Sequence, residues 1–286
     1  MARRPLAPHP KLLHTIADLR RPEARQALVG VDVLWHLAFA VWRPRGARGH
    51  APSAAADTNL TGTANVLAAS PGRVVFASSV AVYGAWPDNR LPLREDAPAR
   101  PTRECAYAGH KLAAERLCTD AAPAAVLRIG AVLGDHADPI VARATLGYRR
   151  VVPAIRGVAQ ALQFVGEDDV AAALLAAGRS EATGTFNIAS EDWLSATDIA
   201  EVSGGRVVRL PRAALVGGSD AAFRLGLLPF GADRAALLNG PLAVDCARAA
   251  VVLGWRPTRR AAEVLAVALG RPSTGPAGTG ARSCSG

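Results

Sequence analysis

A tyrosine and a lysine lie four positions apart in the stretch ECAYAGHKLAAERL, residues 104–117. Residues at this spacing share one face of a helix, so the Tyr107 phenol and the Lys111 ammonium are expected about one turn apart. A phenol ordinarily titrates near pH 10, and a neighbouring ammonium favours the phenolate. The pair is therefore suited to moving a proton to or from an alcohol oxygen. A packed tyrosine beside a solvated lysine is the alternative that the spacing alone leaves open.

Lysine itself is rare in this chain. The sequence holds two lysines, Lys11 and Lys111, among 33 lysines and arginines. An ammonium is a compact charge on a flexible stem, whereas a guanidinium is planar and larger. The use of lysine at position 111 therefore indicates a place where arginine does not serve.

Two serines, Ser78 and Ser79, end the apolar run RVVFASS. Ligands of open α/β sheets bind at the carboxyl ends of parallel strands. A serine hydroxyl at such an end can hydrogen-bond the same substrate oxygen that a nearby tyrosine protonates. A simple turn at the end of the strand is the alternative.

The elements that must position these side chains alternate along the chain. Apolar runs predict strands at 31–39, at the start of 73–84, at 124–134 and at 184–190, and helical periodicity predicts helices at 57–70 and 106–121. Residues 162–178 predict a strand followed by a helix that begins near Asp168 and Asp169. This alternation predicts an α/β fold with a parallel sheet covered by helices.

Beyond Gly134 the alternation loosens. The stretch 191–270 mixes short helices and loops and ends in a helix near 259–269. The tail 270–286 is rich in Gly, Pro, Ser and Thr, so we expect it to be disordered.

The ordered set of motifs resembles the extended short-chain dehydrogenase/reductases, the NAD(P)-dependent epimerase/dehydratase family. The resemblance runs from about Ala17 to about Leu269 and rests on these stretches, in the family's order: ADLRRPEARQALVGVDVLWHLA, NLTGTANVL, FASSVAVYG, YAGHK, LRIGAVLG, QFVGEDDVAAAL, TFNIAS and LGWRP. It implies a Rossmann-type doubly wound parallel sheet with a smaller C-terminal substrate domain. The dinucleotide-binding domain would comprise 1–134 plus about 162–190. The substrate-binding part would comprise about 135–161 plus 191–269.

The resemblance also implies a role for each matching residue. Tyr107 would be the general acid/base, Lys111 would lower the pKa of Tyr107 and bind the nicotinamide ribose, and Ser79 would polarise the substrate carbonyl or alcohol. The implied cofactor is NADP or NAD, whose nicotinamide carries the redox chemistry. The residues implied to contact or support it are Asp18 and Leu19 at the adenine, His36, Leu37 and Ala38 beside the cofactor, Asn59 behind that wall, Ser78, Tyr107, Lys111, and Arg128 and Ile129 near the nicotinamide.

One departure from the family pattern concerns the phosphates. The family's Gly-rich first turn holds the cofactor pyrophosphate at a helix N-terminus, and no GxxGxxG occurs before residue 57. We therefore expect an N-terminally truncated family member that binds dinucleotide weakly. The truncation would leave a strand near 14–17 without a neighbour and the strand carrying His36 with an open edge.

Other positions bear on the choice between NADP and NAD and on the type of reaction. Arg3 and Arg4 lie where a 2′-phosphate would be bound, which favours NADP over NAD, although general arginine richness is an alternative. Val80 and Ala81 follow Ser79 where the dehydrating relatives carry Asp-Glu, which disfavours dehydration. Ala131 stands where the sugar-nucleotide epimerases carry Asn, so a small carbonyl or alcohol is as well supported as a nucleotide sugar.

The sequence thus predicts an NAD(P)-dependent oxidoreductase or epimerase acting on a carbonyl or alcohol of a small-molecule substrate. The alternative is a non-catalytic or cofactor-impaired family member. Substrate specificity is expected in the segments 40–56, 84–103, 135–160 and 190–240. The resemblance further implies a homodimer formed through the helices at 57–70 and 106–121.

Composition argues against several other classes. The net charge is +9, but the arginines are spread evenly without interleaved aromatics, so no specific nucleic-acid partner is expected. No apolar run is long enough to span a bilayer and no secretory signal pattern opens the chain, which predicts a cytoplasmic protein. The four cysteines and the histidines show no metal-ligand spacing, so no metal site and no disulfide framework are expected.

Overall fold

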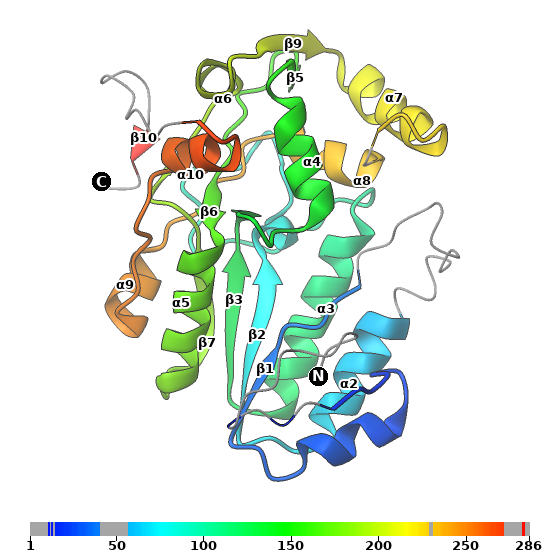
Figure 1. Ribbon diagram of the computed structural model, residues 1–286, viewed down its shortest axis with the longest axis vertical. Helices are drawn as coiled ribbons and strands as arrows, with labels where there is room; N and C mark the ends of the chain where they lie inside the picture. The colour runs from blue at the N-terminus through cyan, green and yellow to red at the C-terminus, as the bar shows by residue number, and fades with distance from the viewer. Residues whose placement is uncertain are drawn as a thin grey trace.

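Four parallel strands form the main sheet, in the order β1-β2-β3-β7 (Figure 1). They are β1 (Val33–His36), β2 (Arg73–Ser79), β3 (Ala124–Ile129) and β7 (Gly184–Ile188). The computed structural model describes residues 11, 13, 15–40, 57–228, 231–271 and 282–283. The register pairs Ser79 with Ile129 and Ile129 with Ile188, so the carboxyl ends of the last three strands lie level.

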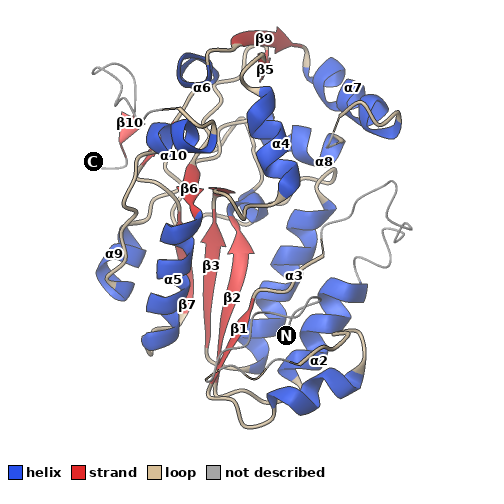
Figure 2. Ribbon diagram, viewed as in Figure 1, coloured by secondary structure: helices blue, strands red, loops and turns tan. Residues whose placement is uncertain are grey.

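Helices cover both faces of this sheet (Figure 2). Helices α2 (Gly62–Leu67) and α3 (Ala106–Ala121) lie on one face, and α5 (Glu167–Arg179) and α9 (Ala247–Leu253) lie on the other. Side chains alternate along β2, so Val74 and Phe76 pack in the core beneath α2 and α3, whereas Val75 packs in the core that contains Ala173 of α5. Strands buried on both faces need continuous apolar runs. The structure therefore confirms the predicted Rossmann-type α/β fold.

A smaller part with its own core lies beyond the carboxyl ends of the strands (Figure 1). Its core contains Leu133, Val152, Phe164, Ile199 and Leu265. The remaining elements are η1 (Pro22–Leu28), η2 (Asp57–Thr61), η3 (Val80–Tyr83), β4 (Ala131–Leu133), α4 (Pro139–Gly147), β5 (Val151–Ile155), β6 (Phe164–Gly166), β8 (Asp192–Trp193), α6 (Ala196–Ser203), β9 (Arg206–Leu210), α7 (Arg212–Arg224), α8 (Ala232–Ala235), η4 (Ala236–Leu238), α10 (Ala261–Ala268) and β10 (Arg282–Ser283). Strands β4 and β6 pair in parallel, as do β5 and β9, and β8 pairs antiparallel with β10.

One segment of the predicted substrate part returns to the main sheet. Leu242, Val244 and Trp255 belong to the same buried cluster as Val75. The Trp255 indole donates to the Asp169 carbonyl oxygen over 2.9 Å, which ties this segment to α5. Leu242, Val244 and Trp255, within the range 191–269 predicted for the substrate part, thus pack against the main sheet, and the division into two parts stays a prediction.

The predicted elements differ from the observed ones mainly at their ends. Helix α3 has the predicted bounds, 106–121. The strand predicted at 124–134 divides at Gly130, whose amide bonds the Ile188 carbonyl oxygen over 2.8 Å, and continues as β4 in another sheet. The helix predicted at 57–70 begins as the single π-helical turn η2 and ends at Leu67.

The N-terminal expectations are tested only where the structure describes the chain. Residues 15–18 lie in no strand, and β1 pairs with β2 and with no other strand among the described residues. Arg3, Arg4, residues 41–56 and most of the tail 270–286 lie outside the described residues, although Arg282–Ser283 of that tail form β10. No helix in the described part of the chain is both long enough and apolar enough to cross a membrane.

Candidate active site

Ser79, Tyr107 and Lys111 meet at the carboxyl end of β2. Ser79 ends β2 and caps η3, and its Oγ accepts from the Ala81 amide over 3.2 Å. Tyr107 lies in the first turn of α3, and the Ser79 side chain lies close enough to the phenol to lower its pKa. Lys111 follows one turn later, with Nζ 5.8 Å from the centroid of the Tyr107 ring.

Lys111 is buried among aromatic rings, with only 5% of its surface exposed. Its Nζ donates to the Ala77 carbonyl oxygen over 2.6 Å. The same atom lies 3.8 Å from the centroid of Phe39 and 5.0 Å from that of Phe76. Burial lowers the pKa of Lys111 to about 7, against the opposing effect of Glu115. The ammonium is therefore close to its titration midpoint at neutral pH.

Tyr107 is half-buried between Phe39 and Arg234. The Phe39 ring meets the Tyr107 ring edge-on, with centroids 5.6 Å apart. The Arg234 Cζ lies 5.6 Å from the centroid of the Tyr107 ring. Burial raises the pKa of Tyr107, while the Arg234 charge and the nearby Ser79 side chain act in the opposite direction. The effect of burial is the larger one in this structure.

The turn that carries Phe39 is fixed by Asn59. The Asn59 side chain accepts from the Ala40 amide over 2.7 Å and donates to the Ala40 carbonyl oxygen over 2.9 Å. Leu37 and Ala38, in the same turn, are exposed. The predicted cofactor wall is thus a defined turn with an open surface, supported by Asn59 from behind.

His36 lies buried beneath this wall. Its Nε2 is 2.8 Å from the Thr63 hydroxyl, which itself donates to the Asn59 carbonyl oxygen. The hydroxyl therefore accepts from His36, so the Nε2 carries the proton. Burial, with a contribution from Lys111, lowers the pKa of His36 to about 4. His36 is consequently neutral at physiological pH.

Ser78 and Arg128 both bind the Glu115 carboxylate of α3. Arg128 bonds both carboxylate oxygens of Glu115, over 3.1 and 2.8 Å, and the Ser78 hydroxyl donates to the same carboxylate. All three side chains are buried, and they join β2, β3 and α3. Ile129 is also buried and pairs in register with Ser79. Contact of Ser78, Arg128 and Ile129 with a cofactor stays a prediction.

Asp18 and Leu19 lie on the surface beside α2. The Asp18 carboxylate is paired with Arg20 over 2.6 Å, and the hydrogen bonds from Arg20 hold the pKa of Asp18 at about 2. Leu19 packs against Gly62, and its carbonyl oxygen accepts from the Asn65 side chain over 2.8 Å. Their predicted role at an adenine is compatible with this exposure and stays a prediction.

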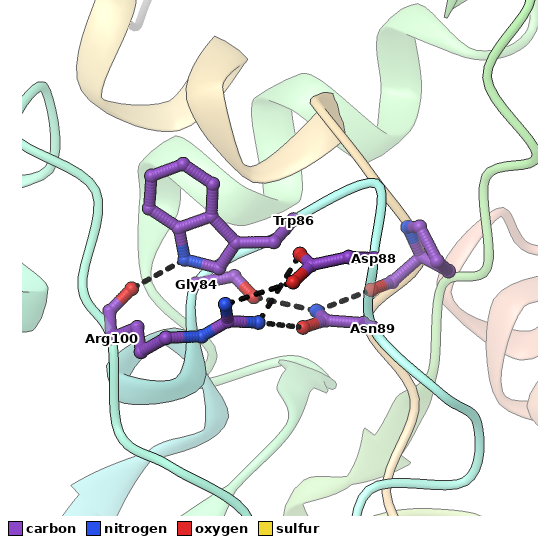
Figure 3. A network of polar contacts seen from close by, with 6 residues as sticks. Gly84, Trp86, Asp88, Asn89 and Arg100 are labelled. Atoms are coloured by element: carbon purple, nitrogen blue, oxygen red, sulfur yellow. Dashed lines mark hydrogen bonds and ion pairs between the residues drawn. The ribbon is translucent and has the colours of Figure 1, made fainter.

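The predicted specificity segment 84–103 follows directly after η3 and is held by a polar network (Figure 3). The Arg100 guanidinium bonds both carboxylate oxygens of Asp88, over 3.0 and 3.2 Å. The Trp86 indole donates to the Arg100 carbonyl oxygen over 2.6 Å, and Asn89 donates to the Gly84 carbonyl oxygen over 2.8 Å. Gly84 has a φ of 71°, and a Cβ there would lie 2.3 Å from the Arg100 carbonyl oxygen. The network therefore ties the first residues of the segment to Arg100 near its other end.

Three residues of the site escaped the sequence prediction: Phe39, Glu115 and Arg234. Glu115 could have been found, because it lies four positions after Lys111 and shares its helix face. Phe39 adjoins the predicted turn at 36–38 but carries no motif of its own. Arg234 is one arginine among many and carries no signal in the sequence.

Comparison with known proteins gives a family match and a similar sequence. Residues 2–189 match the model of the NAD dependent epimerase/dehydratase family. The chain is 27% identical over 265 residues to the uncharacterized protein y4nG of Sinorhizobium fredii, an alignment that covers 85% of this chain and 63% of that protein. The chain thus spans less than two thirds of the length of this relative.

Two solved structures are similar to the whole described fold. MoeE5 in complex with UDP-glucose and NAD gives a TM-score of 0.67 at 23% identity and covers 94% of this chain and 87% of that one. RMD from Pseudomonas aeruginosa complexed with NADPH gives a TM-score of 0.65 at 22% identity, and the alignment covers 93% of this chain and 89% of that one. At this level of identity the likeness establishes the fold.

Proposed function

Because this chain belongs to the NAD dependent epimerase/dehydratase family, we propose that it is an NAD(P)-dependent oxidoreductase or epimerase acting on a carbonyl or alcohol. The single observation that carries this proposal is the meeting of Ser79, Tyr107 and Lys111 at the carboxyl end of β2. A hydroxyl, a phenol and an ammonium in one cluster are the groups that proton transfer at an alcohol requires. MoeE5 was solved with UDP-glucose, which favours a sugar-derived substrate here as well.

The catalytic end of the site fits a nicotinamide nucleotide. Lys111 has three ammonium protons and gives one to Ala77 among the described hydrogen bonds, so two would be left for ribose hydroxyls. Leu37 and Ala38 offer an exposed surface after β1. When bound, the nicotinamide supplies or accepts the hydride. NADP is favoured over NAD by Arg3 and Arg4 only, and both lie outside the described residues.

The chain's own residues would handle the proton. The Ser79 hydroxyl would hydrogen-bond the substrate oxygen and polarise its bond to carbon. In the oxidation direction, the Tyr107 Oη in its phenolate form would take the hydroxyl proton, and in reduction it would return that proton to the carbonyl oxygen. Lys111 would hold the ribose and favour the phenolate by its charge.

A cofactor-impaired family member is the second candidate. It is favoured by one observation: the Phe39 ring covers the Lys111 ammonium, with Nζ 3.8 Å from the ring centroid. Binding of reduced cofactor to the purified chain, followed by its fluorescence, separates the two candidates. Absence of binding to both NADH and NADPH would favour this second one.

The test of the first candidate is hydride transfer, followed by absorbance at about 340 nm with sugar-derived carbonyl substrates. We expect Tyr107→Phe to lower turnover by roughly 100-fold or more, because general acid–base catalysis contributes about that much. Cofactor binding should stay within a few-fold of the original. Tyr148→Phe, in the smaller part, is the matched control and should leave turnover unchanged. Equal turnover in Tyr107→Phe and the original chain would refute the assignment.

A further inference from the structure

Two cations from different parts of the fold flank the Tyr107 ring. Lys111 belongs to the same helix as Tyr107, and its Nζ lies 5.8 Å from the ring centroid. Arg234 belongs to α8 in the smaller part, and its Cζ lies 5.6 Å from the same centroid. The family resemblance accounts for Lys111 and gives Arg234 no role.

The segment that carries Arg234 is anchored against α3. Leu237 of η4 and Tyr107 both pack against the buried cluster of Ala81, Cys105 and Ala108. Helix α7, which contacts α8, is tied to the residue two positions before α3 by an ion pair of 2.8 Å between Arg212 and Glu104. These contacts anchor the segment that carries Arg234 against the start of α3.

The charge of Arg234 is available to the ring. Among the described residues, no ion pair joins Arg234 to a carboxylate. The neighbouring Asp233 accepts from the Gly231 amide over 3.3 Å. A half-buried guanidinium without a carboxylate acts more strongly on a nearby ring than a solvated one does.

The two cations also differ in how firmly they hold their charge. Lys111 is desolvated beneath Phe39 and Phe76 and donates to Ala77, and burial lowers its pKa to about 7. A guanidinium stays protonated at every pH a protein withstands. At neutral and higher pH, Arg234 is therefore the more permanent of the two charges beside the phenol.

We propose that Arg234 is a positioning residue for proton transfer at Tyr107, whose guanidinium favours the phenolate form by lying over the ring. Its value for catalysis rests on the proposed function, but the electrostatic contact exists independently of turnover. The smaller part of the molecule thus contributes a charge to the proton-transfer group as well as a surface for substrate.

The other charged or titratable groups that face Tyr107 act in both directions. Lys111 on α3 favours the phenolate. Cys105, directly before α3, and Asp138, at the start of α4, oppose it when ionised. Arg234 also lowers the pKa of Cys105, so replacement of Arg234 keeps the Cys105 thiol neutral to higher pH and adds no negative charge beside Tyr107.

The experiment is a spectrophotometric titration of the tyrosines in the purified full chain. The chain has three tyrosines, and subtraction of the curve for Tyr107→Phe isolates the titration of Tyr107. We expect Arg234→Met to raise the Tyr107 midpoint by about one pH unit, because a cation within about 6 Å is removed. Arg234→Gln should do the same, and Arg234→Lys should restore most of the original midpoint.

Arg248→Met is the matched control. The Arg248 Cζ lies 5.1 Å from the centroid of the Phe186 ring, so this substitution removes a guanidinium from a different aromatic ring. It should leave the Tyr107 midpoint unchanged. An unshifted midpoint in both Arg234→Met and Arg234→Gln, with a folded circular dichroism spectrum, overturns the proposal. So does an equal shift in Arg248→Met.

Turnover, where present, gives a second readout. The ascending limb of the pH profile of kcat/KM for oxidation should move to higher pH in Arg234→Met by the same amount as the titration. Loss of the proposed function would appear as absent turnover in the original chain, with the titration result unaffected. The two failures are therefore distinguishable.

Discussion

Lys111 is a buried cation whose surroundings explain the choice of lysine. Its ammonium fits between the Ala77 carbonyl oxygen and the Phe39 ring, 2.6 and 3.8 Å away. A guanidinium at the same depth would need more room and more hydrogen-bond acceptors than these neighbours provide. The choice of lysine at this position thus has a local steric reason.

The buried ammonium should make stability depend on pH. The folded pKa of Lys111 is about 7, below the ordinary value of 10.5. Between these values the unfolded chain keeps a proton that the folded chain has lost, so the free energy of unfolding should rise with pH across this window. We expect Lys111→Met to remove about 1–2 kcal/mol of the rise between pH 7 and pH 9. Urea denaturation at both pH values measures it.

The other lysine provides the control for this experiment. Lys11 is exposed, so Lys11→Met should retain the pH dependence of the original chain. A rise of equal size in Lys111→Met and the original chain would show that Lys111 keeps its charge in the folded protein.

At the scale of elements, α3 is the piece that organises the site. It carries Tyr107 and Lys111, and its Glu115 bonds Ser78 of β2 and Arg128 of β3. This buried network holds the helix against the two strands whose carboxyl ends meet at Ser79. Removal of one partner from such a network leaves an uncompensated charge, so its members are constrained together.

The packing of α5 on the sheet edge depends on one glycine. The Trp35 side chain of β1 crosses α5 and donates to the Leu174 carbonyl oxygen over 2.9 Å. A Cβ at Gly178 would lie 1.9 Å from the Trp35 ring. The first strand of the described sheet can therefore meet α5 only where the helix lacks a side chain.

Two glycine substitutions in helices should have opposite effects. Gly178→Ala should lower the free energy of unfolding by about 1–3 kcal/mol, because it overpacks the contact with Trp35. A Cβ added at Gly109 of α3 would have no atom within 4 Å. Gly109→Ala should therefore raise the free energy of unfolding by up to about 1 kcal/mol, the usual gain from alanine in a helix. Midpoints of urea unfolding measure both. A stabilising Gly178→Ala would contradict the observed contact.

At the scale of the whole molecule, the two parts are joined around the site. The main sheet supplies Ser79 and, through α3, Tyr107 and Lys111. The smaller part supplies Arg234 and lies beyond the carboxyl ends of the strands (Figure 1). This arrangement places the groups that we propose for proton transfer where the two parts meet, which is where substrates of α/β folds bind.

The net charge of +9 should support only nonspecific contact with nucleic acid. We expect any retardation of duplex DNA at about 50 mM salt to disappear by about 200 mM, because counterion release governs such binding. A gel-shift series in salt, with DNA of two unrelated sequences, measures this. Binding that survives the higher salt on one sequence alone would contradict the prediction.

Part of this protein follows from its sequence by itself. The alternation of apolar runs and helical periodicity predicts the parallel sheet, and the periodicity of 106–121 gives the bounds of α3. The spacing of Tyr107 and Lys111 places them on one helix face. These properties depend on residues close together in the chain, where backbone geometry fixes what faces what.

Other properties were decided only by the tertiary structure. The sequence did not show that Ser78 and Arg128 turn to Glu115, that 242–255 returns to the main sheet, or that Phe39 covers Lys111. Nor did it show that Arg234 reaches Tyr107 from a segment far along the chain. Such contacts depend on how whole elements pack. The sequence around Arg234 does not distinguish it from the many other arginines that could lie beside the Tyr107 ring. Packing, rather than spacing, selects among them.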